Sequence, residues 1–129
     1  MMTEAERTLL TDLRRALLHL HKTLLDWERA DYEITHGRME PMQALQLIYN
    51  HQRFAWLRPL SGLIVRIDEA LDDVEAVDLV PLMADAQNLT SPAAGSTEAA
   101  RYHAALQELP DAVLAHGQVV ALMKRGKGR

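Results

Sequence analysis

The fold is decided by residues 3–37, which read TEAERTLLTDLRRALLHLHKTLLDWERADYEITHG. They open with Thr3-Glu4-Ala5-Glu6, a capping-box pattern whose Thr hydroxyl and Glu carboxylate satisfy backbone N–H groups at a helix start. Apolar residues, interrupted once by an aspartate, then recur at steps of three and four, which places them on one helix face. The series is Leu10, Leu13, Leu17, Leu20, Leu24, Trp27, Asp31 and Ile34. Gly37 suits a helix end, so we predict one helix of about 33 residues and about 50 Å.

A second apolar stripe predicts a second long helix. Its members are Leu57, Leu60, Ile64, Ile67, Leu71 and Val74. Pro59 lies inside this pattern, where a proline either kinks a helix or marks its start. We favour the kink because Leu57 and Leu60 stay in phase across it.

Shorter helices are expected at Pro41–Tyr49, at Leu79–Leu89 after a capping Asp78, at Thr97–Glu108, and from Asp111 onward. Residues 90–96 collect turn-forming residues and predict a loop. Alternating strand patterns are absent. We therefore predict an all-α bundle of two long amphipathic helices and three or four shorter ones. It forms one domain over residues 1–129, in which the basic tail 124–129 is frayed.

Composition narrows the classes of function. The 129 residues suit a single domain, and a content of 48% hydrophobic and 25% charged residues is ordinary for a globular protein. The absence of cysteine excludes disulfides and thiolate metal sites and suits a reducing compartment. A net charge of −4 disfavours nucleic-acid binding. No secretory signal or membrane-spanning run is evident, so we expect a cytoplasmic protein that binds neither nucleic acid nor membrane.

Polar residues within the helical pattern are candidates for a metal site. Asp31 interrupts the first stripe, where it is either a ligand or proton-handling group inside the bundle, or exposed, or paired with an arginine such as Arg58 or Arg66. We favour the exposed or paired state. His21, Asp31 and His51 are the best metal-ligand candidates. Packing roles are the favoured alternative for the histidines, and we expect no cofactor.

The segment Phe54-Ala55-Trp56-Leu57-Arg58-Pro59-Leu60-Ser61 combines aromatic rings, a guanidinium and a proline. Trp56 and Arg58 could bind a small acid or a partner peptide. Alternatively, the aromatic rings plug the end of the bundle, which is the role we favour. The chain has neither a nucleophile-elbow motif nor a phosphate-binding glycine loop, so no catalytic residue is assigned.

Two stretches carry a resemblance to a known family. The run from Leu18-His19-Leu20-His21-Lys22 to Tyr32-Glu33, and the run from Phe54 through Ser61 to Ile67-Asp68-Glu69, resemble a family of small bacterial helical proteins with no assigned activity. Members of that family often carry an Asp-Pro pair where this chain has His51-Gln52-Arg53. The resemblance implies a bacterial cytoplasmic protein and no reaction, cofactor or site residue.

The favoured function is a non-catalytic helical interaction or regulatory module. Such a module would act by binding a protein partner. The alternative is a bundle that binds a metal ion or small ligand at polar positions of the seam. A 50 Å helix is longer than a domain of about 30 Å needs. We therefore expect part of the stripe from Leu10 to Trp27 to be covered by a second copy in a homodimer. In the competing account, the chain bends near Thr23 or its last helices fold along the first, and the stripe is covered internally.

Overall fold

Seven helical segments follow one another along the chain in the computed structural model, which describes residues 2–73 and 77–127. They are α1 (Glu4–His36), α2 (Pro41–Asn50), the 3-10 helix η1 (Gln52–Leu57), α3 (Arg58–Asp72), α4 (Val80–Thr90), α5 (Thr97–Glu108) and α6 (Pro110–Lys127). The all-α prediction is confirmed. Only α1, with 33 residues, is long, since α3 has 15 and α6 has 18. No helix within the described ranges is long and apolar enough to cross a membrane.

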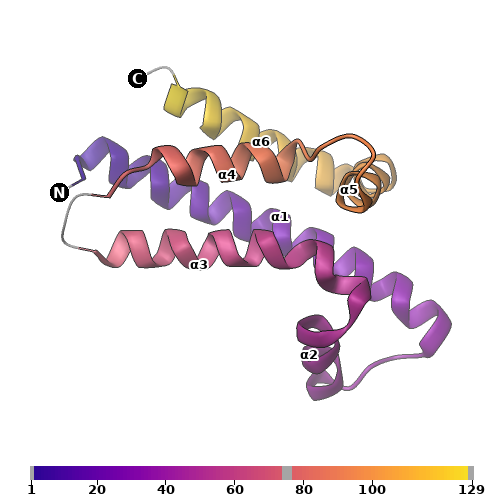
Figure 1. Cartoon of the computed structure of the whole chain (residues 1–129). Coiled ribbons are helices and arrows are strands. Elements are labelled where there is room, and N and C mark those ends of the chain that lie inside the picture. The colour runs from indigo at the N-terminus through magenta and orange to yellow at the C-terminus, as the bar shows by residue number, and fades with distance from the viewer. Residues whose placement is uncertain (1, 74–76, 128–129) are drawn as a thin grey trace.

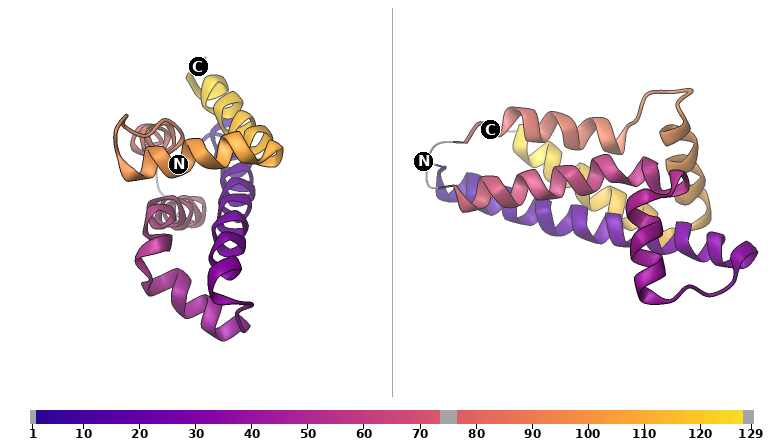
Figure 2. Two further views of the ribbon diagram at one scale, coloured as in Figure 1. Left: turned by 90° about the vertical axis from the view of Figure 1, so that its right-hand side faces the viewer. Right: turned by 60° about the horizontal axis from the view of Figure 1, so that its bottom comes forward.

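Four of the helices form a ring of neighbours around the core. Helix α1 packs on α6 and on α3, and α4 packs on the same two helices. The start of α1 and the end of α6 lie at one end of this bundle (Figure 1). Helix α5 crosses the opposite end (Figure 2), and α2 packs there on η1. The core of the bundle therefore combines segments from both halves of the chain.

Local signals set the limits of α1 as the sequence predicts. The Thr3 hydroxyl accepts from the Glu6 N–H at 3.1 Å, and the Glu6 carboxylate accepts from the Thr3 N–H at 3.0 Å. At the other end Gly37 adopts a φ of 82° and donates its N–H to the Glu33 carbonyl at 2.8 Å. Residues that carry a side chain rarely adopt that φ, which explains why glycine ends this helix.

The apolar stripe of α1 is covered by its own chain. Leu10, Leu13, Leu17, Leu20 and Leu24 are each at most 1% exposed. Helices α6 and α3 make the most extensive contacts with α1. These leucines are therefore covered by helices of the same chain, as in the alternative that folds the last helices along the first, and not by a second copy. The homodimer itself stays a prediction.

Beyond Leu24 the buried face of α1 differs from the prediction. Glu28 and Tyr32 are buried, whereas Asp31 is exposed and Ile34 is 83% exposed. The step from Leu24 to Glu28 to Tyr32 is four residues each time, which rotates the buried face slightly around the helix. The rotation follows a change of partner, because this part of α1 packs on η1 and its neighbours instead of the ring.

Pro59 marks the start of a helix and not a kink. Helix α3 begins at Arg58, with Pro59 in its first turn, where the missing N–H needs no partner. The preceding six residues form η1, so Leu57 remains buried beside Leu60 although the two belong to different elements. Val74, the last predicted member of this stripe, lies outside the described residues.

The buried face of α6 is made chiefly of small side chains. It consists of Ala112, Ala115, Val119 and Met123. The apolar residues Val113 and Leu114 of the same helix are instead 50% and 66% exposed. Alanines allow α6 to approach α1 closely. The helix continues to Lys127, and Arg125 pairs with Asp12 at 3.0 Å, whereas residues 128 and 129 of the predicted frayed tail lie outside the described residues.

Candidate binding groove

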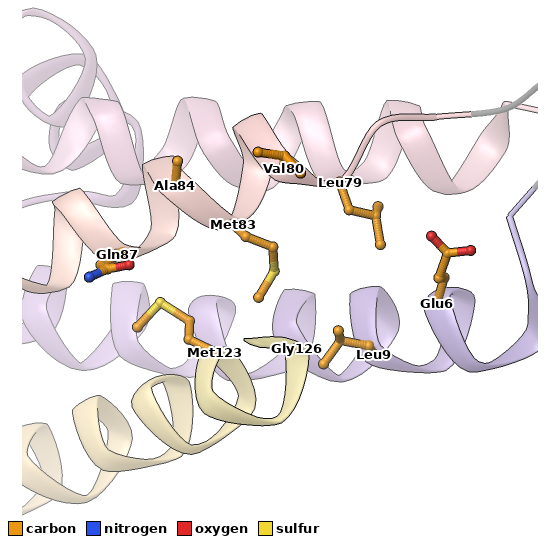
Figure 3. A pocket seen from close by; sticks show the side chains of 9 residues that line it. All are labelled: Glu6, Leu9, Leu79, Val80, Met83, Ala84, Gln87, Met123 and Gly126. Carbon is orange, nitrogen blue, oxygen red and sulfur yellow. The ribbon is translucent and has the colours of Figure 1, made fainter. Parts of the chain in front are cut away.

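An apolar groove opens at the end of the bundle where α1 and α4 begin and α6 ends. Its volume is about 440 Å³. Figure 3 shows Leu79, just before α4, and Met83 of α4 pointing toward α1 and α6 across it. The lining residues are Glu6, Leu9, Leu79, Val80, Met83, Ala84, Gln87, Met123 and Gly126. Helix α4 packs on α3 and α6 but scarcely on α1, which leaves this space beside it.

At Gly126, side chains of α4 and α1 come close to the backbone of α6. A Cβ atom placed there would lie 2.8 Å from Met83 Cε and 3.2 Å from Leu9 Cδ2. Both side chains therefore lie directly against the α6 backbone. Leu9 is 2% exposed, whereas Val80, on the α4 side, is 72% exposed. The groove thus has a buried apolar floor and an open α4 wall.

The chemistry of the lining is that of an apolar binding site. Methionine side chains are flexible and polarizable, so Met83 and Met123 can adapt to ligands of different shape. The polar groups of the lining are Glu6, whose carboxylate accepts from the Thr3 N–H at 3.0 Å, and the Gln87 amide. They come from different helices. Such a lining can hold an apolar molecule and offers at most two polar contacts.

Trp56 and Arg58, the predicted ligand-binding residues, do not border a common cavity. The Arg58 guanidinium is exposed and donates to the His51 carbonyl at 2.8 Å, which caps the end of α2. Trp56 is half-buried, with its ring edge-on to that of Trp27 at a centroid distance of 6.4 Å. The aromatic segment packs at the end of the bundle, and a ligand-binding role for Trp56 or Arg58 stays a prediction.

The three predicted metal ligands lie in different surroundings. Asp31 pairs with Arg53, and not with either arginine suggested by the sequence. His51 Nδ1 accepts from the Arg53 N–H at 3.0 Å, and burial lowers the pKa of His21. Among residues 2–73 and 77–127, no three His, Asp or Glu side chains are placed to hold a metal ion. A metal site remains a prediction, for which elemental analysis is the test.

A buried ionic cluster centred on Glu28 was not foreseen from the sequence. Glu28 is 2% exposed, and its carboxylate pairs with Arg53 of η1 at 3.2 Å and with Arg101 of α5. The Arg101 guanidinium carbon lies 4.3 Å from the ring centroid of Trp27. The Trp27 indole in turn donates to Glu108 at 2.6 Å. This cluster ties α1 to η1 and α5, and its one sequence signal is that Glu28 lies four residues after Leu24.

The sequence does not predict the groove either, because no local pattern marks it. Leu9, Met83 and Gly126 are separated by more than forty residues at each step along the chain and meet only through packing. Comparison of the chain with protein families, with curated proteins and with solved structures finds no match. The family resemblance of the two sequence stretches is therefore not supported beyond a small all-helical protein.

Proposed function

We propose that this protein is a non-catalytic helical binding module and that the groove between α1, α4 and α6 binds a small, neutral, apolar molecule. The observation that supports this most strongly is the buried floor of Leu9 and Met123 beneath an open space of about 440 Å³. Cavities of this size that are lined mainly by apolar side chains are typical of small-molecule sites. The module would have a regulatory role if a partner protein bound it only when the groove is occupied.

The lining selects against charged ligands. Its one ionisable side chain is Glu6, so a ligand carboxylate would meet a like charge and no cation among the lining residues. A cation would leave water for walls of Leu, Val and Met, which is costly. A neutral molecule instead replaces water on apolar surface at both ligand and protein, which is the main source of favourable free energy in such sites.

Binding is assigned in place of catalysis because the lining cannot perform acid–base chemistry. General acid–base catalysis requires positioned groups whose pKa suits proton transfer. Glu6 already belongs to the capping box of α1, and Gln87 does not titrate. The groove can hold a ligand, and occupancy would link α4 to α1 and α6, which stabilises the folded state by mass action.

The test uses a neutral naphthylamine dye whose fluorescence rises in apolar surroundings. Gly126→Leu places a branched side chain where Met83 and Leu9 already make close contact. Gly117→Leu is the matched control, because it lies on the same helix and nothing is within 4 Å of its added Cβ. We expect dye binding to be lost in the Gly126 variant alone. Equal binding by both variants, each folded by circular dichroism, would contradict the proposal.

The proposal also includes a homodimer in a bacterial cytoplasm, the setting implied by the family resemblance. The surface that supports self-association is the outward face of α2. Met42, Leu45 and Tyr49 are 68%, 49% and 69% exposed there, at helical spacing, and α2 has no charged residue. Sedimentation equilibrium decides the state: twice 14.5 kDa, reduced by Leu45→Lys, supports the dimer, and 14.5 kDa contradicts it.

A further inference from the structure

A second cavity, of about 400 Å³, lies between η1 and α5 and is separate from the apolar groove. Arg53 and Trp56 of η1 and Glu98 and Arg101 of α5 border it, and the buried Glu28 of α1 lies beneath. Its lining is therefore polar and aromatic. The contacts of these five side chains indicate what kind of molecule it would hold.

Two buried N–H donors beside this cavity lack an acceptor. Within the described part of the chain, Trp56 Nε1 and Arg101 Nε are the only buried side-chain nitrogen or oxygen atoms without a hydrogen-bond partner. Buried donors in folded proteins are almost always paired, so each exception calls for an explanation. Both exceptions occur at residues that border the same cavity. Trp56 also borders a smaller space of about 50 Å³, which Arg101 does not line, so an acceptor beside both residues would lie in the larger cavity.

The acceptor is not supplied by the carboxylates already present. The two oxygens of the Glu28 carboxylate are both in use, because one accepts from Arg53 Nε and the other accepts from Arg101 Nη2. Asp31 pairs with Arg53, and Glu108 accepts from the Trp27 indole. Arg101 Nε therefore remains without an acceptor although its guanidinium is held firmly in place.

The charge around the cavity limits the class of ligand. Glu98 is exposed at its rim, and its side chain has no ion pair or hydrogen bond with another described residue. It lies three residues before Arg101 in α5, a spacing that puts the two side chains on neighbouring positions of one helix face. A simple anion would be repelled by Glu98, and a simple cation would leave both N–H donors unpaired. A molecule with an acceptor group and a cationic group side by side meets both requirements.

We infer that this cavity binds a free α-amino acid in its zwitterionic form. The ligand carboxylate accepts from Arg101 Nε and Trp56 Nε1, and the ligand ammonium group faces the Glu98 carboxylate. Both donor atoms are buried, so binding requires their side chains to rotate toward the cavity. The competing account is that Glu98 itself turns and pairs with Arg101 Nε, in which case no ligand is required.

The experiment measures the thermal midpoint of the full chain with each of the twenty standard L-amino acids at millimolar concentration. Each active amino acid is compared with its amide and with the acid that lacks the amino group. The variants are Trp56→Phe, which keeps the ring and removes the donor, and Glu98→Gln. Glu69→Gln is the matched control, because Glu69 is an exposed carboxylate on α3 away from the cavity lining.

We expect at least one amino acid to raise the midpoint and both of its derivatives to fail. Loss of one charge-assisted hydrogen bond should weaken affinity about tenfold or more in Trp56→Phe and in Glu98→Gln, and leave it unchanged in Glu69→Gln. The inference is overturned if no amino acid raises the midpoint, if the derivatives act equally, or if both cavity variants bind normally. Gly126→Leu should retain amino-acid binding, which separates this inference from the apolar groove.

Discussion

Glu28 and Arg101, which are 73 residues apart in the chain, form an ion pair that joins α1 to α5. Glu28 is 2% exposed and also pairs with Arg53. A buried carboxylate is stable only when such partners replace its contacts with water. The pair therefore explains how a crossing helix and a 3-10 segment are held at the end of the bundle.

Replacement of Glu28 should be strongly destabilising. Glu28→Ala leaves Arg101 without a carboxylate and Arg53 with Asp31 alone, and because the two arginines are 27% and 32% exposed we expect a loss of roughly 2–3 kcal/mol in the free energy of unfolding. Urea denaturation measures it. Asp26→Ala, which breaks the exposed pair of Asp26 with Lys22 one turn apart, is the control and should cost about 0.5 kcal/mol or less. Equal losses would contradict a special role for Glu28.

Two positions of the predicted α1 stripe should respond in opposite ways to a charge. Leu13 is 0% exposed, so Leu13→Lys buries an ammonium group in the core, and we expect loss of the folded state. Ile34 is 83% exposed, and Ile34→Lys should change the free energy of unfolding by about 0.5 kcal/mol or less. Thermal circular dichroism distinguishes them. A Leu13→Lys protein with full helicity and an unchanged midpoint would show that this stripe is not the core.

Two glycines of α6 should differ when replaced by alanine. Alanine favours a helix over glycine by up to about 1 kcal/mol. Gly117 has open space around its Cβ position, so Gly117→Ala should be stabilising. At Gly126 the new methyl group would crowd Met83 Cε and Leu9 Cδ2, so the gain should be smaller or reversed. Urea denaturation compares them, and a larger gain at Gly126 would mean that the groove floor is looser than described.

The contact between Tyr102 and His116 should make stability depend on pH. The Tyr102 hydroxyl lies 2.7 Å from His116 Nδ1. Burial, with a smaller contribution from the charge of His103, lowers the pKa of His116 below its usual 6.5. The unfolded chain then binds the proton more readily, so stability from this histidine is present above about pH 6.5 and lost as the pH falls below it.

Urea denaturation at about pH 7.5 and about pH 5.5 measures this loss, and the carboxylates of the chain contribute to it as well. The comparison is therefore with His116→Asn, which removes the titrating ring and can still accept a hydrogen bond. We expect the unchanged protein to lose more stability on acidification than the variant does. Identical losses in the two proteins would show that His116 takes no part.

The limits of several helices were predictable from the sequence because local chemistry sets them. The capping box at Thr3 and the glycine at position 37 act within one turn of the backbone, and α5 occupies the predicted range Thr97–Glu108. The proline at position 41 also begins its helix as predicted. At Pro59 the local signal allowed two outcomes, a kink or a helix start, and the apolar phase of its neighbours favoured the wrong one.

The sequence by itself determined an all-helical chain with α1 as its longest element, since helical periodicity and capping depend on residues a few positions apart. The tertiary structure decided which side chains are buried, since burial depends on which helix packs opposite. In the second half of α1, packing buries Glu28 and Tyr32 in place of the predicted Trp27 and Asp31. Packing also covers the leucine stripe with α6. It also assembled both cavities from helices far apart in the chain, which no short-range pattern records.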